Sequence, residues 1–301
     1  MKIFITGIES FVGTYLQKIL KKKNYSVYGI DKNKKKTSTI KFDITDKNLH
    51  KIIPNGCDCL IHLAAISTPM AFNRNLLNSF KVNVNGTLNV IQSAIKKNVK
   101  QIIFASTEWV YGEEKNLNIK NEDSFISLKK ISSDYAFSKI LGEQIFEYYS
   151  NKININFTIL RFGIIYGPRF NVQNFSAVES IINTMISDKK LIVGSKKTAR
   201  RFIYITDLCE GIIKSIGLKG FHKYNLTGNK LINLEQIYKI TGKILNFKSN
   251  LFEKKKNIYN IRNIDSQKFR NYSEWRSKVD IEEGIENIVN QIKKNSSNNL
   301  K

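Results

Sequence analysis

Short apolar runs alternate with helical stretches through the first half of the chain. The runs are rich in Ile, Phe, Val and Leu and nearly continuous, which is typical of strands buried on both faces of a sheet. They lie at Lys2–Thr6, Ser26–Ile30, Cys59–Leu63, Gln101–Ser106 and Ile155–Leu160. The stretches between them predict helices over Phe11–Lys22, Met70–Lys97 and Tyr135–Ser150. This alternation predicts a parallel sheet covered on both sides, a doubly wound α/β fold.

The alternation breaks down after Leu160. One more strand is expected at Phe202–Ile205, followed by a helix at Leu208–Ile216. The rest of the chain, including the amphipathic stretch Ile281–Lys293, is expected to form a smaller region over the sheet edge. We therefore place a domain boundary after residue 162, and expect residues 201–226 to return to the sheet of the first domain.

The composition is that of a globular protein. Apolar residues make up 42% and aromatic residues 11% of the 301 residues. No uninterrupted apolar run reaches the roughly 20 residues that a membrane-spanning helix needs. The first residues predict a strand and not a charged leader before a long apolar segment. We therefore expect a cytoplasmic protein without a membrane span.

The formal net charge of +24 is the strongest deviation in composition. Such a charge is compatible with a nucleic acid or a membrane surface as partner. The lysine runs are scattered, however, and no aromatic residues are regularly interleaved with them; they lie at residues 21–23, 34–36 and 254–256. We expect no specific nucleic-acid partner, only salt-sensitive attraction. An anionic small substrate would be attracted equally well.

Cysteine usage gives no sign of a metal site or a structural disulfide. Cys57, Cys59 and Cys209 are odd in number and lack the paired spacing of a zinc site. We interpret them as reduced packing residues and predict no metal.

The first strand runs into "ITGIESFVG", residues 5–13, which has the order of a dinucleotide-binding turn. Gly7 and Gly13 occupy the outer glycine positions of that turn, and Ser10 stands where the middle glycine is usual. Strand, turn and helix follow one another so that a pyrophosphate could sit at the helix N-terminus.

The second strand ends in "VYGID", with Asp31 at its tip. A carboxylate at this place can accept hydrogen bonds from the adenosine-ribose hydroxyls and would repel a 2′-phosphate. This favours NAD over NADP, although Lys32 and the lysines at 34–36 could receive a phosphate. The alternative for Asp31 is a plain turn or helix-cap role.

A hydroxyl-rich pattern follows in "FASTEWVYGE", residues 104–113, and "SSDYAFSKILGEQ", residues 132–144. Tyr135 and Lys139 are four residues apart, so their side chains lie on one face of a helix. Tyrosine ionises near pH ~10, but a neighbouring ammonium and a positive nicotinamide would stabilise the phenolate as a general base. Thr107, at the end of its strand, could hold the substrate oxygen. Together these side chains could remove an alcohol proton as hydride leaves for a cofactor.

At these residues the chain resembles the extended short-chain dehydrogenases/reductases, in the NAD-dependent sugar epimerase/dehydratase group. The resemblance covers nearly the whole chain. It rests on "TGIESFVG", Asp31, "FDITD" with Asp43, "HLAA" at 62–65, "NVNGTLNV" at 83–90, "STEWVYGE", "YAFSK", "LRFGIIYGPR" at 160–169, "RRFIYITD" at 200–207 and "YNLTG" at 224–228.

The resemblance implies roles that spacing alone does not give. Residues 1–162 would be an NAD-binding Rossmann domain, and residues 163–301 mainly a binding region for a nucleotide-diphosphate sugar. The implied cofactor contacts are Gly7, Ser10, Phe11, Val12, Gly13, Asp31, Asp43, Ile44, Leu63, Ala64, Ala65, Tyr135 and Lys139. The implied substrate contacts are Thr107, Arg200 and Arg262. Members of the family commonly form homodimers through the helices represented here by residues 70–97 and 135–150.

The residues after Thr107 bear on which reaction is expected. Sugar 4,6-dehydratases of this family carry an acid and a base there, and here the two positions hold Glu108 and Trp109. An indole cannot transfer protons, so dehydration is disfavoured. We predict a 4-epimerase that works through a transient 4-keto sugar, with Tyr135 as base and Glu108 among the catalytic residues. The alternatives are an NAD(P)H-dependent 4-ketosugar reductase and a non-catalytic member that senses NAD(P) or binds RNA or protein.

Two positions depart from the family pattern on the substrate side. Ile164 stands where an asparagine usually contacts the nucleotide sugar, and Arg201 where aspartate is common. The sugar and the nucleotide are therefore not predicted. His62 is expected to be a structural strand-end residue.

Overall fold

The chain divides into two units. The structure, a computed structural model, describes residues 1–33, 39–169, 176–187, 189–247 and 250–298, so the lysines at 34–36 lie outside the described residues. Unit 1 comprises Met1–Gly112, Ser124–Phe162 and Cys209–Asn225, and unit 2 comprises Glu113–Asp123, Gly163–Leu208 and Leu226–Lys301. The cofactor-binding and substrate-binding roles of residues 1–162 and 163–301 stay predictions.

A seven-stranded sheet forms the centre of unit 1. Its strands are β1 (Lys2–Thr6), β2 (Ser26–Asp31), β3 (Ile40–Lys41), β4 (Cys59–His62), β5 (Gln101–Thr107), β7 (Asn156–Phe162) and β12 (Phe221–Leu226). The strand order is β12-β7-β5-β4-β1-β2-β3, and every pairing from β3 to β7 is parallel. The order reverses between β1 and β4, where doubly wound folds bind their ligands. The predicted Rossmann-like fold is confirmed.

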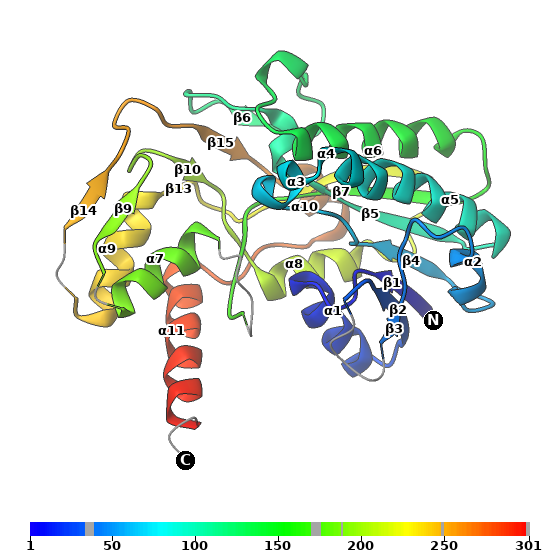
Figure 1. Ribbon diagram of the computed structural model, residues 1–301, viewed down its shortest axis with the longest axis horizontal. Coiled ribbons are helices and arrows are strands. Elements are labelled where there is room, and N and C mark those ends of the chain that lie inside the picture. Colours follow the sequence, from blue (N-terminus) through cyan, green and yellow to red (C-terminus); the bar gives the residue numbers. More distant parts are fainter. Residues whose placement is uncertain (34–38, 170–175, 188, 248–249, 299–301) are drawn as a thin grey trace. The chain divides into compact units, whose positions relative to one another are not determined.

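Helices cover both faces of this sheet (Figure 1). They are α1 (Phe11–Lys22), α2 (Leu49–Ile52), α3 (Pro69–Arg74), α4 (Leu76–Phe80), α5 (Gly86–Lys96), α6 (Asp134–Ser150) and α8 (Ile205–Lys214), with 3-10 turns η2 (Glu108–Tyr111) and η3 (Leu128–Lys130). In the core, Phe146 of α6 stacks on Phe104 of β5 and meets Phe157 of β7 edge to face. The aromatic side chains thus fasten α6 to the two strands beneath it.

The prediction of a single helix over residues 70–97 is wrong. The segment is divided into α3, α4, a π-helical turn η1 (Lys81–Asn85) and α5. Asn75 breaks the first part because its backbone is not helical (φ −149°, ψ 87°) and its side chain caps α4 by accepting from the N–H of Asn78. The buried Asn83 side chain bonds both backbone groups of Ile66. Polar caps and a side-chain bridge therefore override the apolar periodicity.

Unit 2 is built from short strands and helices. Its strands are β6 (Ile119–Lys120), β8 (Ile165–Tyr166), β9 (Leu191–Val193), β10 (Ala199–Arg200), β11 (Ile203–Tyr204), β13 (Ile232–Asn233), β14 (Leu251–Glu253) and β15 (Ile261–Ile264). Its helices are α7 (Ala177–Ile186), α9 (Leu234–Leu245), α10 (Gln267–Ser273) and α11 (Ile281–Asn298). The largest sheet has the order β13-β10-β15-β6. This arrangement confirms the smaller α/β region that was expected after the first domain.

The strand expected over Phe202–Ile205 is shorter than predicted. Only Ile203 and Tyr204 pair with β8, which is itself two residues long, and α8 begins at Ile205 rather than at Leu208. Asp207 in the first turn of α8 accepts from the Ser277 hydroxyl and from the backbone N–H groups of Lys278 and Val279. A carboxylate at this position also suits the positive end of the helix.

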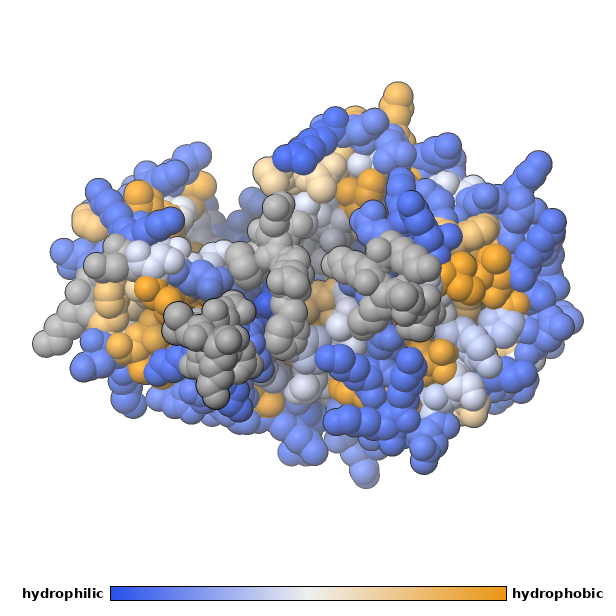
Figure 2. Space-filling model, turned by 60° about the horizontal axis from the view of Figure 1, so that its bottom comes forward, coloured by the Kyte–Doolittle hydropathy of each residue, from blue (hydrophilic) through white to orange (hydrophobic). Residues whose placement is uncertain are grey.

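The surface is mainly polar. In the view of Figure 2, hydrophilic residues cover most of the face and apolar residues form separate patches. Among the described residues, no helix is long and apolar enough to cross a membrane.

We predict that Phe157→Ala lowers the free energy of unfolding of the protein by about 3–5 kcal/mol, the usual cost of removing a fully buried ring. Phe157 is completely buried on β7. Tyr148→Ala is the control, because Tyr148 is exposed on α6. Urea unfolding followed by circular dichroism measures both, and equal losses in the two variants would contradict the described core.

Candidate active site

The turn after β1 packs closely on its neighbours only because two of its residues have no side chain. Gly7 has a φ of +74°, and a Cβ on it would lie 2.8 Å from the backbone nitrogen of Ala64. A Cβ on Gly13 would lie 2.5 Å from the carbonyl oxygen of Gly7. The turn therefore packs directly on the backbone after β4, and α1 packs directly on the turn. Tight turn and close helix packing are the roles of these glycines in a dinucleotide site.

Ser10 is the N-cap of α1. Its Oγ accepts a hydrogen bond from the backbone N–H of Gly13 at 3.0 Å. The serine at the middle position thus satisfies one of the free N–H groups of the helix. Phe11 and Val12 follow in the first turn, with Phe11 half-buried and Val12 buried. A serine cap is compatible with a phosphate at this helix end, because its hydroxyl hydrogen can still be donated.

Asp31 lies beside the turn at the end of β2. Its carboxylate accepts from the backbone N–H of Glu9 at 3.1 Å and of Asn33 at 2.9 Å. Gly7 also donates its N–H to the Ile30 carbonyl at 2.8 Å, so β2 and the turn are held together. The glycine turn and the Asp31 carboxylate lie side by side, as the binding of a pyrophosphate and the adjoining adenosine ribose requires. The residues present therefore fit a dinucleotide.

Asp43 and Ile44 are partly engaged within the protein. Asp43 accepts from the Thr45 N–H and hydroxyl and pairs with Lys32 at 3.3 Å. Burial opposes the charge of Asp43, but the Thr45 hydrogen bonds and Lys32 outweigh it and lower the pKa of this carboxyl. Ile44 is buried against Gly86. Leu63, Ala64 and Ala65, on the segment after β4, are half-buried.

Thr107, Tyr135 and Lys139 come together at the C-terminal end of β5. Thr107 is the last residue of that strand, and its side chain hydrogen-bonds the Tyr135 side chain. Lys139, one helical turn after Tyr135, donates from Nζ to the Ala105 carbonyl oxygen at 2.7 Å. Its ammonium also lies 4.7 Å from the Phe104 ring centroid. A threonine hydroxyl, a phenol and an ammonium therefore lie within one small region.

Burial favours the neutral form of both Tyr135 and Lys139. It raises the pKa of Tyr135 to about 12, although the Thr107 hydrogen bond opposes the rise. It lowers the pKa of Lys139 to about 7, although Glu143 opposes the fall. Tyr135 is therefore a phenol near neutral pH in the protein alone, and a base role requires added positive charge beside it.

Glu108 and Trp109 follow Thr107 in η2. Glu108 is buried, with 1% of its surface exposed. The Trp109 backbone N–H donates to the Thr107 hydroxyl at 3.3 Å, and the indole meets the Tyr135 ring edge to face at 6.4 Å between centroids. The aromatic side chain thus borders the tyrosine where dehydratases of the family would carry a second proton-transfer group.

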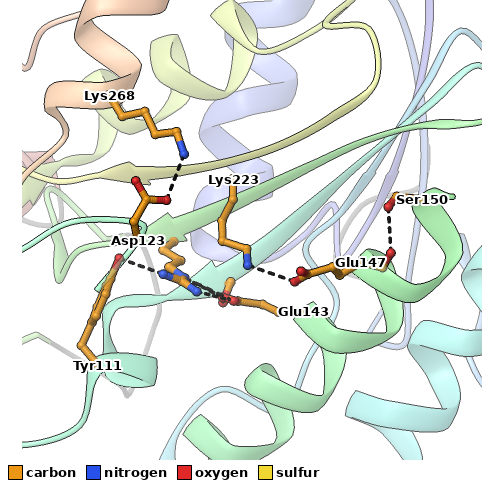
Figure 3. Close-up of polar contacts among 9 residues, drawn as sticks. Tyr111, Asp123, Glu143, Glu147, Ser150, Lys223 and Lys268 are labelled. Carbon is orange, nitrogen blue, oxygen red and sulfur yellow. Dashed lines mark hydrogen bonds and ion pairs between the residues drawn. The ribbon is translucent and has the colours of Figure 1, made fainter. Parts of the chain in front are cut away.

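A buried polar network next to Lys139 was missed by the sequence reasoning. The Glu143 carboxylate accepts from Arg161 Nη2 at 2.6 Å and from the Ser106 hydroxyl at 2.5 Å. Arg161 in turn donates to the Tyr111 hydroxyl, which donates to Asn225. Figure 3 shows Glu143 and Tyr111 at two ends of these contacts. The signal was present, because Glu143 repeats the four-residue spacing of Tyr135 and Lys139.

The two predicted substrate arginines lie side by side in unit 2. Arg200 on β10 is in parallel register with Arg262 on β15, and both are buried. Arg200 bonds the Asn260 carbonyl at 2.8 Å and its side-chain oxygen, whereas Arg262 lies 3.9 Å from Glu113. Two buried guanidinium groups on neighbouring strands can bind an anion of high charge.

The two departures from the family pattern also lie in unit 2. Arg201 donates to the Asn263 side chain and to the Asn229 carbonyl, and burial lowers its pKa. Ile164 is half-buried, and its carbonyl accepts from the N–H of Ile203.

His62 is a buried structural residue. Its ring nitrogens lie 2.7 Å from the Thr6 hydroxyl and 3.1 Å from the Thr87 hydroxyl. Burial, reinforced by the charge of Lys139, lowers its pKa to about 3, so the ring is neutral. Within the described residues, no three His, Cys, Asp or Glu side chains are grouped as metal ligands.

The chain is similar in sequence and in fold to known proteins. The family model for the NAD dependent epimerase/dehydratase family matches residues 3–226. A putative UDP-glucose 4-epimerase of Methanocaldococcus jannaschii is 28% identical, with 98% of this chain and 99% of that protein aligned. A crystal structure of UDP-glucose 4-epimerase from Thermotoga maritima with UDP-glucose is similar at a TM-score of 0.87 and 21% identity, covering 98% of this chain and 100% of that one.

A second structure is similar at higher identity. It is a mutant UDP-glucuronic acid 4-epimerase from Bacillus cereus in complex with UDP-4-deoxy-4-fluoro-glucuronic acid and NAD. The TM-score is 0.84 at 25% identity, with 98% of this chain and 99% of that chain covered.

We predict that Ser10→Gly retains dinucleotide binding and lowers the free energy of unfolding by only about a few tenths of a kcal/mol, whereas Ser10→Ala lowers it by about 1 kcal/mol through loss of the cap. Calorimetric titration with NAD and urea unfolding measure the two effects. A large loss of NAD affinity in Ser10→Gly would show that the hydroxyl is itself a cofactor ligand.

Proposed function

The chain belongs to the NAD dependent epimerase/dehydratase family, and we propose that it is a nucleotide-sugar 4-epimerase that uses NAD. Membership makes it an enzyme of the epimerase/dehydratase type. The observation that carries the finer proposal is the meeting of Thr107, Tyr135 and Lys139 at the end of β5. Full-length similarity to proteins named as UDP-sugar 4-epimerases supports it.

In the proposed mechanism Thr107 holds the C4 hydroxyl of the sugar and Tyr135 removes its proton. When bound, oxidised NAD supplies the hydride acceptor and a positive charge. Lys139 stays protonated beside the phenolate, and it would also hold the nicotinamide ribose. Tyr135 gives its proton back when the 4-keto sugar is reduced on the opposite face. A low-dielectric site strengthens each of these charge interactions.

We propose that the turn at Gly7, Ser10 and Gly13 receives the pyrophosphate and that Asp31 receives the adenosine ribose. The packing of Gly7 on the Ala64 backbone supports this, because a side chain there would collide with the protein. The fixed Asp31 carboxylate supports NAD over NADP, since it would repel a 2′-phosphate.

The substrate proposed is a nucleotide-diphosphate sugar. Arg200 and Arg262 are the proposed partners of its diphosphate, supported by their burial on neighbouring strands of unit 2. UDP-glucose and UDP-glucuronate are the first compounds to test, because relatives carry those names.

The homodimer expected from the family also stays a proposal. Met70, Leu76 and Leu77 on α3 and α4 leave large parts of their apolar side chains exposed. Burial of these side chains against a second copy would be favourable.

We predict that Tyr135→Phe abolishes turnover and leaves the fold intact, because the phenol oxygen is the only group removed. Tyr148→Phe, an exposed position on the same helix, keeps full activity as the matched control. Product formation from UDP-glucose or UDP-glucuronate by NMR, with circular dichroism of both variants, makes the comparison. Full activity in Tyr135→Phe would refute the assigned base.

We predict that purified protein retains NAD, since an epimerase regenerates its cofactor in each cycle. Absorbance at 260 nm and mass spectrometry of the extracted nucleotide test this. An empty site that is filled by added NADPH, with consumption of NADPH by a 4-keto sugar, would instead identify the 4-ketosugar reductase. RNA binding at physiological salt without any nicotinamide binding would contradict the proposed use of NAD.

A further inference from the structure

Helix α6 presents three polar side chains to the end of β5. Tyr135, Lys139 and Glu143 are spaced by four residues, so they share one face of the helix. Each contacts a different residue of the strand: Tyr135 bonds Thr107, Lys139 bonds the Ala105 carbonyl, and Glu143 accepts from the Ser106 hydroxyl. Three consecutive strand residues thus fix one helical face, and two of the three helix residues belong to the proposed mechanism.

The Glu143 carboxylate is held in place from its other side. Arg161 on β7 approaches it with Nε at 2.9 Å and 3.2 Å from the two oxygens and with Nη2 at 2.6 Å. Both side chains are 2% exposed. The guanidinium is oriented further by Tyr111, whose ring it also covers at 4.9 Å. A paired, fully hydrogen-bonded carboxylate of this kind has almost no freedom to move.

The buried cations beside α6 require a negative charge close to them. Lys139 and Arg161 are both buried cations, and an uncompensated buried charge is strongly destabilising. The titratable groups whose charges interact with Lys139 are His62 on β4, which is neutral, and Glu143 on α6, and Tyr135 lies one turn before Lys139 on the same helix. Of these, Glu143 is the carboxylate whose charge acts on Lys139.

We propose that Glu143 is a positioning residue: its carboxylate, clamped by Arg161, seats α6 on β5 and supplies the negative charge that balances the ammonium of Lys139. The inference rests on the proposed function for its consequence in catalysis. A purely structural ion pair between Glu143 and Arg161 would leave Lys139 unaffected. The contact of Glu143 with Ser106, between the residues that hold Lys139 and Tyr135, is what links the pair to the catalytic face.

The sign of the effect follows from the charges. Burial lowers the pKa of Lys139 to about 7 against the opposing influence of Glu143. Loss of the carboxylate charge therefore lowers that pKa further, and Lys139 loses its proton at a lower pH. Because the protonated lysine supports the Tyr135 phenolate, activity is then lost at a lower pH on the alkaline side.

The test compares the pH dependence of kcat/KM for the wild-type protein, Glu143→Gln and Glu147→Gln. Glu147 is the matched control, one turn further along α6, exposed, and paired with Lys223 (Figure 3). We expect the alkaline limb of Glu143→Gln to move to lower pH by about one unit or more and that of Glu147→Gln to stay in place. A folded Glu143→Gln with an unshifted limb would overturn the proposal. If Glu143→Gln does not fold, Glu143→Asp, which keeps the charge, must fold and keep the wild-type limb.

A second measurement does not need activity. Urea unfolding measures how much Glu143→Gln lowers the free energy of unfolding, here called its penalty. The penalty is measured at pH 5.5 and at pH 9, in the wild-type background and in the Lys139→Met background. At pH 5.5, below the folded pKa of Lys139, the penalty includes both cations. At pH 9 the folded lysine is neutral, so only Arg161 contributes. We expect a larger penalty at pH 5.5 in the wild-type background and an equal one at both pH values in Lys139→Met.

The two experiments separate the two claims. A wild-type penalty that does not change with pH would overturn the role of Glu143. Absence of turnover with every nucleotide sugar, together with a pH-dependent penalty, would refute the proposed function and leave the coupling of Glu143 to Lys139 standing.

Discussion

The structure around the C-terminal end of β5 depends on how the buried ammonium of Lys139 is accommodated. A cation in an apolar environment is costly unless its donors are satisfied and its charge is balanced. The Ala105 carbonyl, the Phe104 ring and the Glu143 charge meet these needs in part, since burial still lowers the pKa of Lys139 to about 7. They can do so only if α6 lies in one register on β5. The packing of Phe146 between Phe104 and Phe157 secures that register from the apolar side.

The parallel sheet brings the remaining groups to the same edge. Thr6 and His62 end their strands in register, whereas β5 continues from Phe104, the partner of His62, to Thr107. The glycine turn, the alanine segment after β4 and the hydroxyl of Thr107 therefore all lie at C-terminal strand ends. Gly7 lets the turn contact the Ala64 backbone, and Ser10 caps the helix that starts there. The proposed cofactor turn and the proposed proton-transfer group can therefore share one edge of the sheet.

Much of this could be predicted from the sequence because the signals are local. The strands of unit 1, the turn at Gly7 and Gly13, and the pairing of Tyr135 with Lys139 each follow from spacing of two to six residues. The break at Asn75 and the partners of Glu143 and Arg161 could not be predicted. The partners of Glu143 and Arg161 come from elements far apart in the chain. The cap at Asn75 is local, but a polar residue in an apolar pattern does not reveal whether it interrupts the helix. The assignment of Ser10 as a cap lies between these cases, since serine at a helix start is a known cap but a phosphate site was expected there.

In the proposed reaction the sugar is oxidised at C4 and reduced again by the same hydride. The most direct measurement uses a UDP-sugar that carries deuterium at C4 and follows the label by NMR. The account predicts the C4 epimer with deuterium kept at C4, because the hydride leaves and returns without exchange with water. A C4 epimer that carries hydrogen from the solvent at C4 would contradict it.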